Sequence, residues 1–464
     1  MISLPSAQAT VTPPASTIPW GQCPALAEGQ TRDPRQACGT LQVPLDYRAA
    51  NGRTIEVAVS RIPAAKPAQR QGVLLLNGGG PGPSLDVPSI LAPLLPAGVI
   101  DRYDLVAFDP RGIAHSTPIS CGRSAEELVR DQELEVLSFP AGNGSIHRNV
   151  AYSRAMSKRC AAESGDLLLY LTTANVARDM DQIRLALGER RVSYHGLSWG
   201  TYLGAVYRAL FPRRVERMVL DSSVDPNVRG YDDFRTFGVA MEDRFPDLAR
   251  FAVEHSDTVG FGTTESQVRA KYLAVTAKLD RKPVTVPGSG APLTGNLVRM
   301  FTVLMSYSDS SLPTLTQLWR AAANFADGSP TSEDVALARQ IANGLVATGT
   351  LPGVPQDNLF SVGWAISCGD ARWPRDVRTY ARNTAADRAA HPLTAGAPAN
   401  VTPCSFWKFR PIEPAVRVRD TACATCSSCR TSGIRRLRWS PHRACVGPSA
   451  PAPSWSTLTP AITA

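Results

Sequence analysis

The sequence predicts an α/β protein with a mostly parallel sheet, because apolar segments typical of strands alternate with helix-like segments along residues 39–231. Two strand-like segments lie in residues 39–60 and are joined by a turn at Asn51-Gly52, a pair typical of hairpins. Further apolar runs follow in the order GVLLLN, YDLVAF, RVSYHG and RMVLDS. Between them, residues 175–187 carry apolar side chains three and four positions apart, on one face of a helix: Val176, Met180, Ile183 and Leu187. Strands that alternate with helices form a parallel sheet covered on both faces.

Composition narrows the class of protein further. A chain of 464 residues is too long for one small core and suits a large catalytic domain that carries an inserted subdomain. No apolar run is long enough to span a membrane. The net charge is +9, but five arginines and no acidic residue lie from Thr421 onward, which leaves about four positive charges for residues 1–420. We therefore expect no nucleic-acid partner, and we find no basic helix to suggest one.

Strand-like segments give way to helical ones from about Asp232 to Gln356, and we expect an inserted helical lid there. The sheet is expected to resume with FSVGWAISCGD and to continue past RPIEPAVRVRD. The expected domains are an N-terminal extension (1–38), the first part of the core (39–231), the lid (232–356), a truncated second part of the core (357–420) and a disordered, out-of-frame tail (421–464).

The first residues, MISLPSAQATVTPPASTIPWGQC, have neither the charged nor the apolar region of a signal peptide. Their richness in Ser, Thr, Pro and Ala is similar to the linker that often follows a cleaved signal. We therefore expect the natural start to lie upstream.

The sharpest motif is Gly196-Leu197-Ser198-Trp199-Gly200, which fits the pattern G-x-S-x-G. A strand-like segment precedes it and a helix-like segment follows it, as in the turn that exposes a nucleophilic serine above a sheet. The N-terminus of the following helix supplies positive potential where negative charge develops in a reaction. We therefore predict that Ser198 is a catalytic nucleophile; the alternative is a structural helix cap.

A glycine-rich loop, Asn77-Gly78-Gly79-Gly80-Pro81-Gly82, follows the strand VLLL. Glycine amides at the end of a strand can donate hydrogen bonds to an oxyanion, and the Trp199 amide can supply a second donor. The alternatives are a tight turn and a phosphate loop, but no Lys-Ser or Lys-Thr follows, which excludes a Walker A loop.

With these motifs, the chain resembles the secreted bacterial tripeptidyl- and prolyl-aminopeptidases, a branch of the α/β-hydrolases. The resemblance spans residues 20–420 and rests on CGTLQVPLDY, NGGGPG, FDPRGIAHS, TTANVARDMDQIRLALG, GLSWGTYLGAVY, RMVLDSSVDP, AISCGD and CSFW. Within the matching motifs the chain departs from the family pattern at a few loop positions: Gly78 where the family favours proline, and Pro83, Leu85 and Ala114 in place of smaller residues.

The resemblance implies an α/β-hydrolase fold with a helical lid over a Ser-Asp-His site. It implies that Ser198 is the nucleophile and that Gly79, Gly80 and Trp199 are the oxyanion donors. The implied substrate is a peptide with a free N-terminus. We expect a secreted or cell-envelope protein, a monomer, with no cofactor and no metal.

Ten cysteines fall into two groups. Six are spread through the body of the chain, and because the resemblance implies secretion we expect them to form disulfides between neighbours in sequence: Cys23 with Cys38, Cys121 with Cys160, and Cys368 with Cys404. Buried free thiols are the alternative. The other four have a spacing that also occurs in metal and iron–sulfur sites: Cys423, Cys426, Cys429 and Cys445.

The triad acid and base are not evident in the chain. The resemblance places the Asp in a segment like NLRDPATP and the His in a GGHG-like turn, and neither occurs. Three histidines follow Ser198, each in a context typical of a surface residue: His255, His391 and His442. His195 adjoins the motif and is expected to pack there. Glu242 and Asp243 in the lid are weak candidates for holding a substrate amine.

The composition changes abruptly at about Thr421, after which Asp, Glu, Lys, Asn, Gln, Met, Phe and Tyr are all absent. If the frame is shifted by one base, the codons from Cys426 to Trp439 can encode LLLQNLRDPATPL, which is the acid segment of the family. The codons from Trp455 to Ala464 can likewise encode VDVDAGDHG, a strand followed by the His turn. We therefore predict that the tail is a frameshift product and that the last strands of the sheet are missing.

Three functions remain open on this sequence. The first is a serine exopeptidase, or another hydrolase such as an esterase, that lacks its base as written and is nearly inert. The second is a non-catalytic binding protein on the same scaffold. The third is a metal site in the tail, which the frameshift argues against.

Overall fold

The structure is a computed structural model that describes residues 17–26, 29–49, 51–289, 291–347 and 351–418, with the backbone alone for 342–347 and for 426–429. Within these residues a seven-stranded sheet has the order β1-β2-β4-β3-β5-β6-β7. Its strands are β1 (Ala37–Pro44), β2 (Thr54–Ile62), β3 (Gly72–Asn77), β4 (Tyr103–Phe108), β5 (Val192–Leu197), β6 (Val215–Asp221) and β7 (Cys426–Cys429). Strands β1 and β2 pair antiparallel, β2 pairs antiparallel with β4, and all later pairs are parallel. The predicted mostly parallel sheet is confirmed.

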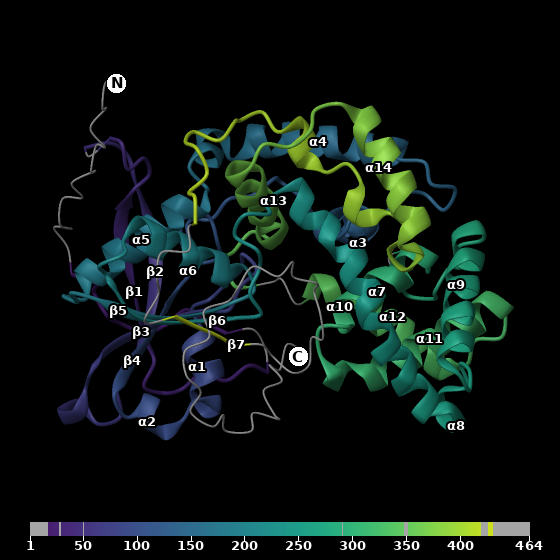
Figure 1. Cartoon of the computed structure of the whole chain (residues 1–464), viewed down its shortest axis with the longest axis horizontal. Helices are drawn as coiled ribbons and strands as arrows, with labels where there is room; N and C mark the ends of the chain where they lie inside the picture. The colour runs from purple at the N-terminus through teal and green to yellow at the C-terminus, as the bar shows by residue number, and fades with distance from the viewer. Residues whose placement is uncertain are drawn as a thin grey trace.

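Helices cover both faces of the sheet, as Figure 1 shows. Helices α5 (Thr173–Ala186) and α6 (Trp199–Leu210) pack on one face, and α1 (Val87–Leu91) and α2 (Ala97–Ile100) lie on the other. Successive residues of β3 point to opposite faces, so that Leu75 joins the core under α5 and α6 while Leu76 joins the core under α1. Burial on both faces explains why the central strands read as continuous apolar runs.

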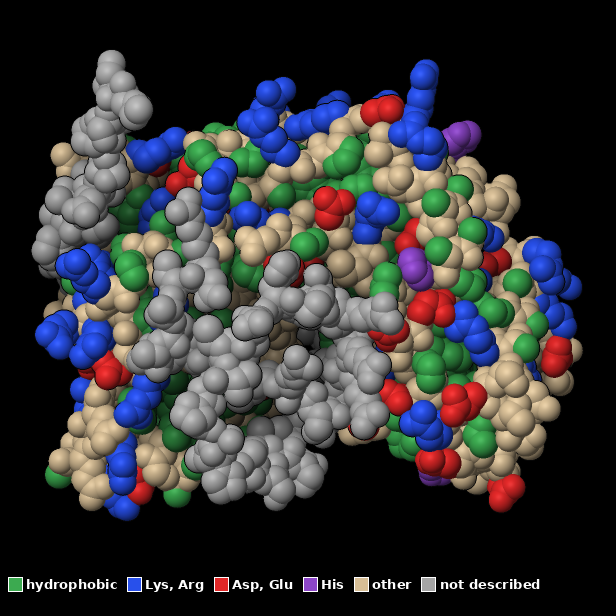
Figure 2. Space-filling view, viewed as in Figure 1, with side chains coloured by type: hydrophobic (Ala, Val, Ile, Leu, Met, Phe, Trp, Pro, Cys, Tyr) green, Lys and Arg blue, Asp and Glu red, His purple; other side chains and the backbone are tan. Residues whose placement is uncertain are grey.

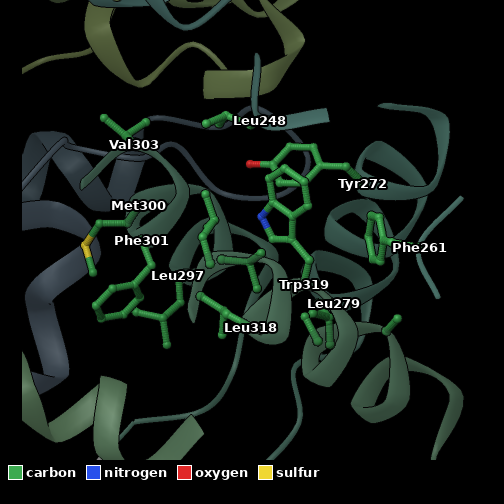
Figure 3. Close-up of a cluster of buried hydrophobic side chains, with 14 of the residues drawn as sticks. Leu248, Phe261, Tyr272, Leu279, Leu297, Met300, Phe301, Val303, Leu318 and Trp319 are labelled. Atoms are coloured by element: carbon green, nitrogen blue, oxygen red, sulfur yellow. The ribbon is translucent and has the colours of Figure 1, made fainter. Parts of the chain in front are cut away.

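The helices between β6 and α13 form a second body beside the sheet (Figure 1). They are α7 (Tyr231–Glu254), α8 (Ser256–Val259), α9 (Glu265–Arg281), α10 (Gly295–Met305), α11 (Leu312–Asp327) and α12 (Ser332–Ala347). Their shared core surrounds the buried Trp319, whose ring lies 5.5 Å from Phe245 and 5.3 Å from Tyr272 (Figure 3). Phe139 and Leu393, which lie outside the predicted lid, also belong to this core. The exact limits of the lid, 232–356, therefore stay a prediction.

One predicted element is wrong. The segment FSVGWAISCGD was expected to resume the sheet, but it lies in helix α13 (Asn358–Asp370), and residues 411–418 contain no strand. Eight of its thirteen residues are buried: Asn358, Ser361, Val362, Trp364, Ala365, Ile366, Cys368 and Gly369. A short apolar run that is buried on most sides has no clear period of two or of 3.6, so the sequence pattern does not separate a strand from a helix.

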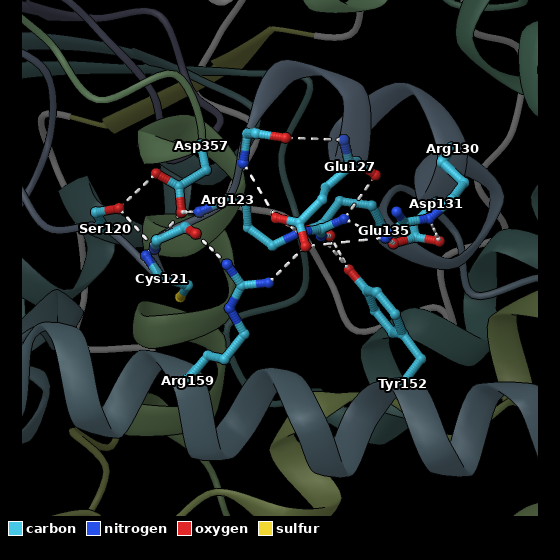
Figure 4. Close-up of polar contacts among 12 residues, drawn as sticks. Ser120, Cys121, Arg123, Glu127, Arg130, Asp131, Glu135, Tyr152, Arg159 and Asp357 are labelled. Carbon is cyan, nitrogen blue, oxygen red and sulfur yellow. Dashed lines mark hydrogen bonds and ion pairs between the residues drawn. The ribbon is translucent and has the colours of Figure 1, made fainter. Parts of the chain in front are cut away.

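A buried polar network holds α13 against α3 (Ala125–Glu135) and α4 (His147–Glu163) (Figure 4). The Arg123 guanidinium pairs with Glu135 at 2.5 Å and with Asp131 at 2.9 Å. Glu135 also accepts hydrogen bonds from the hydroxyl of Tyr152 and from the indole of Trp364, at 3.2 Å for the latter. Burial raises the pKa of Glu135 to about 7. Because Glu135 and its partners come from three helices, the network fixes how these helices pack.

At the start of α13, a second carboxylate continues the network. Asp357 accepts hydrogen bonds from the Ser120 hydroxyl and from the Cys121 amide, both at 2.7 Å (Figure 4). The loop that leads into α3 is therefore tied to the N-terminus of α13. Together with the Glu135 contacts, this places α13 firmly beside the sheet.

Three disulfides join the residues expected from the sequence. They are Cys23–Cys38, Cys121–Cys160 and Cys368–Cys404, with sequence separations of 15, 39 and 36 residues. The second fastens the loop before α3 to α4, and the third fastens α13 to the turn at Pro403–Phe406. Loops of these lengths contribute roughly 3–4 kcal/mol each in the chain-entropy account.

Charged side chains of both signs are interspersed on the face in view in Figure 2, with no separate basic patch among the described residues there. This agrees with the small charge excess of residues 1–420, and the absence of a nucleic-acid partner stays a prediction. None of the helices in the described ranges is both long enough and apolar enough to cross a bilayer.

Candidate active site

Ser198 stands at the junction of β5 and α6, with φ of 53° and ψ of −122°. A positive φ is rare for a residue other than glycine and marks a strained turn. Two glycines make the turn possible. A Cβ on Gly196 would lie 2.4 Å from the Gly200 carbonyl oxygen, and a Cβ on Gly200 would lie 2.6 Å from Oδ1 of Asn77. The pattern G-x-S-x-G is therefore required by close packing at this turn.

Backbone and hydroxyl contacts hold the turn on both sides of Ser198. Its N–H donates to the Asp221 carbonyl at the end of β6, at 3.1 Å. Its carbonyl accepts hydrogen bonds from the Thr201 amide at 2.8 Å and from the Thr201 hydroxyl at 2.7 Å. The same hydroxyl oxygen accepts from the Val224 amide at 3.1 Å. The serine is thus fixed relative to two neighbouring strands, and its side chain remains partly exposed.

The glycine loop lies directly against this turn. A Cβ on Gly79 would be 2.6 Å from the Leu197 carbonyl oxygen and 3.0 Å from the Ser198 Cβ. Gly79 and Gly80 also have positive φ angles, of 92° and 104°. The structure therefore brings the predicted donor loop and the predicted nucleophile together.

The three predicted oxyanion donors differ in their hydrogen bonding. The Gly79 N–H donates to Oδ1 of Asn77 at 3.0 Å, so in this structure it is occupied. Trp199 is the first residue of α6, and a helix leaves its first amides without an internal acceptor. Gly80 is exposed at the tip of the loop. Of the three, only the Gly79 amide is bonded to a side chain, so its role as a donor stays a prediction, as do those of Gly80 and Trp199.

Asp109 supports the far side of the loop, and the sequence reasoning gave it no role. Its buried carboxylate accepts from the Ser84 amide at 2.7 Å and from the Leu85 amide at 3.0 Å. It also accepts from the His115 amide at 3.1 Å. The segment FDPRG, noted only as part of the resemblance, was the one signal that could have identified it.

Three of the described histidines have neighbours other than Ser198. His195 on β5 has its Nε2 3.9 Å from Oδ2 of Asp221, which is too long for a hydrogen bond. His255 stacks on Phe251 at the end of α7. His391 lies 2.8 Å from Asp387 on α14 (Val377–Ala390). Within the described ranges no hydrogen bond joins any of these three to Ser198.

Glu242 and Asp243, the two weak candidates for binding a substrate amine, differ in their partners. Glu242 pairs with Arg269 at 2.8 Å, so its charge is already compensated. Asp243 has a buried Oδ2 with no hydrogen-bond partner among the described residues. His442, Cys423, Cys445 and the codons predicted to hide the acid and the base lie outside the described residues, and Cys426 and Cys429 are described in their backbone only.

Comparison with known proteins agrees with this geometry. Residues 72–289 match the family model described as the alpha/beta hydrolase fold. A tripeptidyl aminopeptidase of Streptomyces lividans is 33% identical over 404 residues, which cover 86% of this chain and 72% of that protein.

Two mycobacterial proteins share shorter parts. The serine protease Hip1 of Mycobacterium bovis is 37% identical over 214 residues, covering 45% of this chain and 40% of that one. Carboxylesterase B of Mycobacterium tuberculosis is 31% identical over 297 residues, covering 60% of this chain and 55% of that one. The chain therefore belongs to the aminopeptidase family of the α/β-hydrolases and is, by family, a serine hydrolase.

Proposed function

We propose that the chain is a serine aminopeptidase in which Ser198 attacks a carbonyl carbon near the free N-terminus of a peptide. The observation that carries this proposal is the turn of Ser198, held at positive φ with the Gly79-Gly80 loop against it. The Ser198 oxygen forms a bond to the carbonyl carbon, and the carbonyl oxygen takes up the negative charge. In this proposal the Gly80 and Trp199 amides donate hydrogen bonds to that oxygen. Collapse expels the amine and leaves an acyl-enzyme, which water then hydrolyses.

This mechanism needs a histidine that takes the proton from Ser198 and an acid that orients the histidine. No described histidine forms a hydrogen bond with Ser198. Removing the histidine of a serine triad costs on the order of a million-fold in turnover. We therefore propose that the chain as written is nearly inert, because its acid and base segments are hidden in the other reading frame after about Thr421.

The three disulfides support an oxidising compartment, so we place the protein outside the cytoplasm, secreted or in the cell envelope. For the substrate amine, Asp243 is the better of the two candidates, because Glu242 is neutralised by Arg269. A monomer without cofactor completes the proposal.

An esterase is the second candidate, and the 31% identity to a carboxylesterase B favours it. The two functions differ in the bond that is cleaved. An aminopeptidase requires the free amine of its substrate, whereas an esterase cleaves acyl esters that have none.

The test compares the chain as written with a chain whose frame is restored near Thr421. Each is assayed on a tripeptide anilide with a free N-terminus, on its acetylated counterpart and on a short acyl ester. We expect the restored chain to release the aniline only from the peptide with a free N-terminus, and Ser198→Ala to abolish this release. Ester cleavage without peptide cleavage would favour the esterase. Codons for Cys426–Ile434 that do not spell the acid segment would refute the frameshift.

A further inference from the structure

The side chain of Trp199, the residue directly after Ser198, is anchored to another helix. Its indole Nε1 donates a hydrogen bond to the hydroxyl oxygen of Thr173 at 3.2 Å. Thr173 is fully buried and is the first residue of α5. The indole itself packs partly buried against the core under α5 and α6 and against the core around α13. Trp199 therefore bridges the helix that carries the nucleophile and two of its neighbours.

Asp370, the last residue of α13, holds Thr173 in turn. Its Oδ1 accepts from the Thr173 amide at 2.7 Å, and its Oδ2 accepts from the Thr173 hydroxyl at 2.6 Å. A hydroxyl has one proton, and here that proton points to the carboxylate. The lone pairs of the Thr173 hydroxyl oxygen therefore accept the indole N–H of Trp199. The carboxylate of Asp370 thus decides which group donates at each step: the indole to the hydroxyl, and the hydroxyl to the carboxylate.

The side chains around Asp370 include both charged and polar groups, which influence whether its carboxylate carries a proton. The groups that face it are Tyr202 on α6, Arg229 before α7 and Glu413 in the segment after the third disulfide. Arg229 donates to the Tyr202 hydroxyl at 3.2 Å, and Glu413 pairs with Arg178 at 2.7 Å. Burial raises the pKa of Asp370 to about 6, while the Thr173 hydrogen bonds act in the opposite direction. Asp370 also lines a small pocket with Tyr202 and Glu413.

We propose that Thr173 and Asp370 are positioning residues that hold Trp199 so that its backbone N–H points at the oxyanion formed on Ser198. The inference rests on the proposed function, since it concerns an oxyanion donor of that reaction. The donor amide and the anchored indole belong to one residue, so fixing the side chain restricts the rotation of the peptide that carries the N–H. Preorganised donors are effective because they do not reorient during the reaction. Neither Thr173 nor Asp370 touches the substrate in this account.

The bond chain is tested first in the full chain as written, without any need for activity. The indole N–H of Trp199 is identified in a proton–nitrogen correlation spectrum as the signal lost in Trp199→Phe. We expect this signal to move with pH with a midpoint near 6, the pKa of Asp370. The movement should vanish in Asp370→Asn and in Thr173→Val and persist in Thr173→Ser. Trp319 is the internal control, because its indole also donates to a threonine, Thr302, at 2.9 Å, but that threonine donates onward to a backbone carbonyl.

The positioning role is tested by the rate at which a fluorophosphonate labels Ser198 in the frame-restored chain. We expect Thr173→Val to lower the rate by about 10- to 100-fold, as for a misplaced catalytic group. Thr173→Ser should restore most of it. The matched control is Thr384→Val on α14. This substitution also removes a buried hydroxyl, which donates a 3.2 Å hydrogen bond to the Ala399 carbonyl.

The outcomes separate the two proposals. If the pH-dependent movement of the Trp199 signal is unchanged in both Asp370→Asn and Thr173→Val, the bond chain from Asp370 through Thr173 to Trp199 is overturned. Ser198-dependent labelling that Thr173→Val leaves unchanged overturns the positioning role, whatever the spectrum shows. A restored chain with no Ser198-dependent labelling overturns the proposed function, and the positioning role with it, while the spectrum still decides whether the bonds exist.

Discussion

The amide of Ser198 donates a 3.1 Å hydrogen bond to the carbonyl of Asp221, so the nucleophile's turn is fastened to the end of the neighbouring strand. On the other side of the turn, Thr201 holds the carbonyl of Ser198. The geometry of the serine is therefore set by hydrogen bonds within the protein that are already formed before a substrate binds. Preorganisation of this kind makes the turn sensitive to small changes around it.

Thr201→Val should loosen the turn. The substitution removes the 2.7 Å bond to the Ser198 carbonyl and leaves the Val224 amide without its hydroxyl acceptor. We expect a loss of about 1–3 kcal/mol in unfolding free energy, measured by urea denaturation, because the partly buried Val224 amide is left without an acceptor. Thr201→Ser keeps the hydroxyl and should lose much less. Equal losses for both variants would mean that the hydroxyl contributes nothing.

Gly79→Ala should disturb the loop and the nucleophile together. A Cβ there would meet the Leu197 carbonyl oxygen at 2.6 Å, on a residue whose φ is 92°. We expect a cost of at least about 1–3 kcal/mol from the backbone strain alone, seen as a lower melting temperature. Gly98→Ala is the matched control, since a Cβ at Gly98 has nothing within 4 Å. A Gly79 variant as stable as the Gly98 variant would show that the loop does not pack on the turn as described.

The disulfide between Cys121 and Cys160 should contribute substantially to stability. Both cysteines are fully buried, and their bond closes a loop of 39 residues. Replacing both by serine should lower the unfolding free energy by roughly 3–4 kcal/mol in the chain-entropy account. Peptide mapping without reductant should recover the two peptides joined. Recovery of both as free thiols would contradict the structure.

The raised pKa of Glu135 predicts that the stability of the fold depends on pH. Burial raises its pKa from 4.5 to about 7 in the folded chain. Between these values the folded state binds a proton that the unfolded state has lost, so unfolding free energy falls as pH rises from about 4.5 to about 7. In Glu135→Gln this part of the slope should disappear. The measurement is urea unfolding at a series of pH values, and an unchanged slope in the variant would contradict the assignment.

Much of the fold follows from local sequence pattern, and particular exceptions show where pattern is insufficient. The strand before Ser198 and the helix after it were predicted because periodicity and two glycines agree there. Helix α13 was not predicted, because its buried residues follow neither the period of a strand nor that of a helix. The bond between Thr173 and Asp370 spans 197 positions, so only the packed structure brings the two residues together. The occupied amide of Gly79 depends on the direction of the Asn77 side chain, which no sequence motif specifies.

The central claim is that Ser198 is the nucleophile, and covalent labelling tests it most directly. The frame-restored chain is treated with a fluorophosphonate and digested, and the mass of the peptide that contains Ser198 is measured. The account predicts one phosphonyl adduct on Ser198, none in Ser198→Ala, and almost none in the chain as written. An adduct of equal yield in the Ser198→Ala variant, or on a different serine, would contradict it.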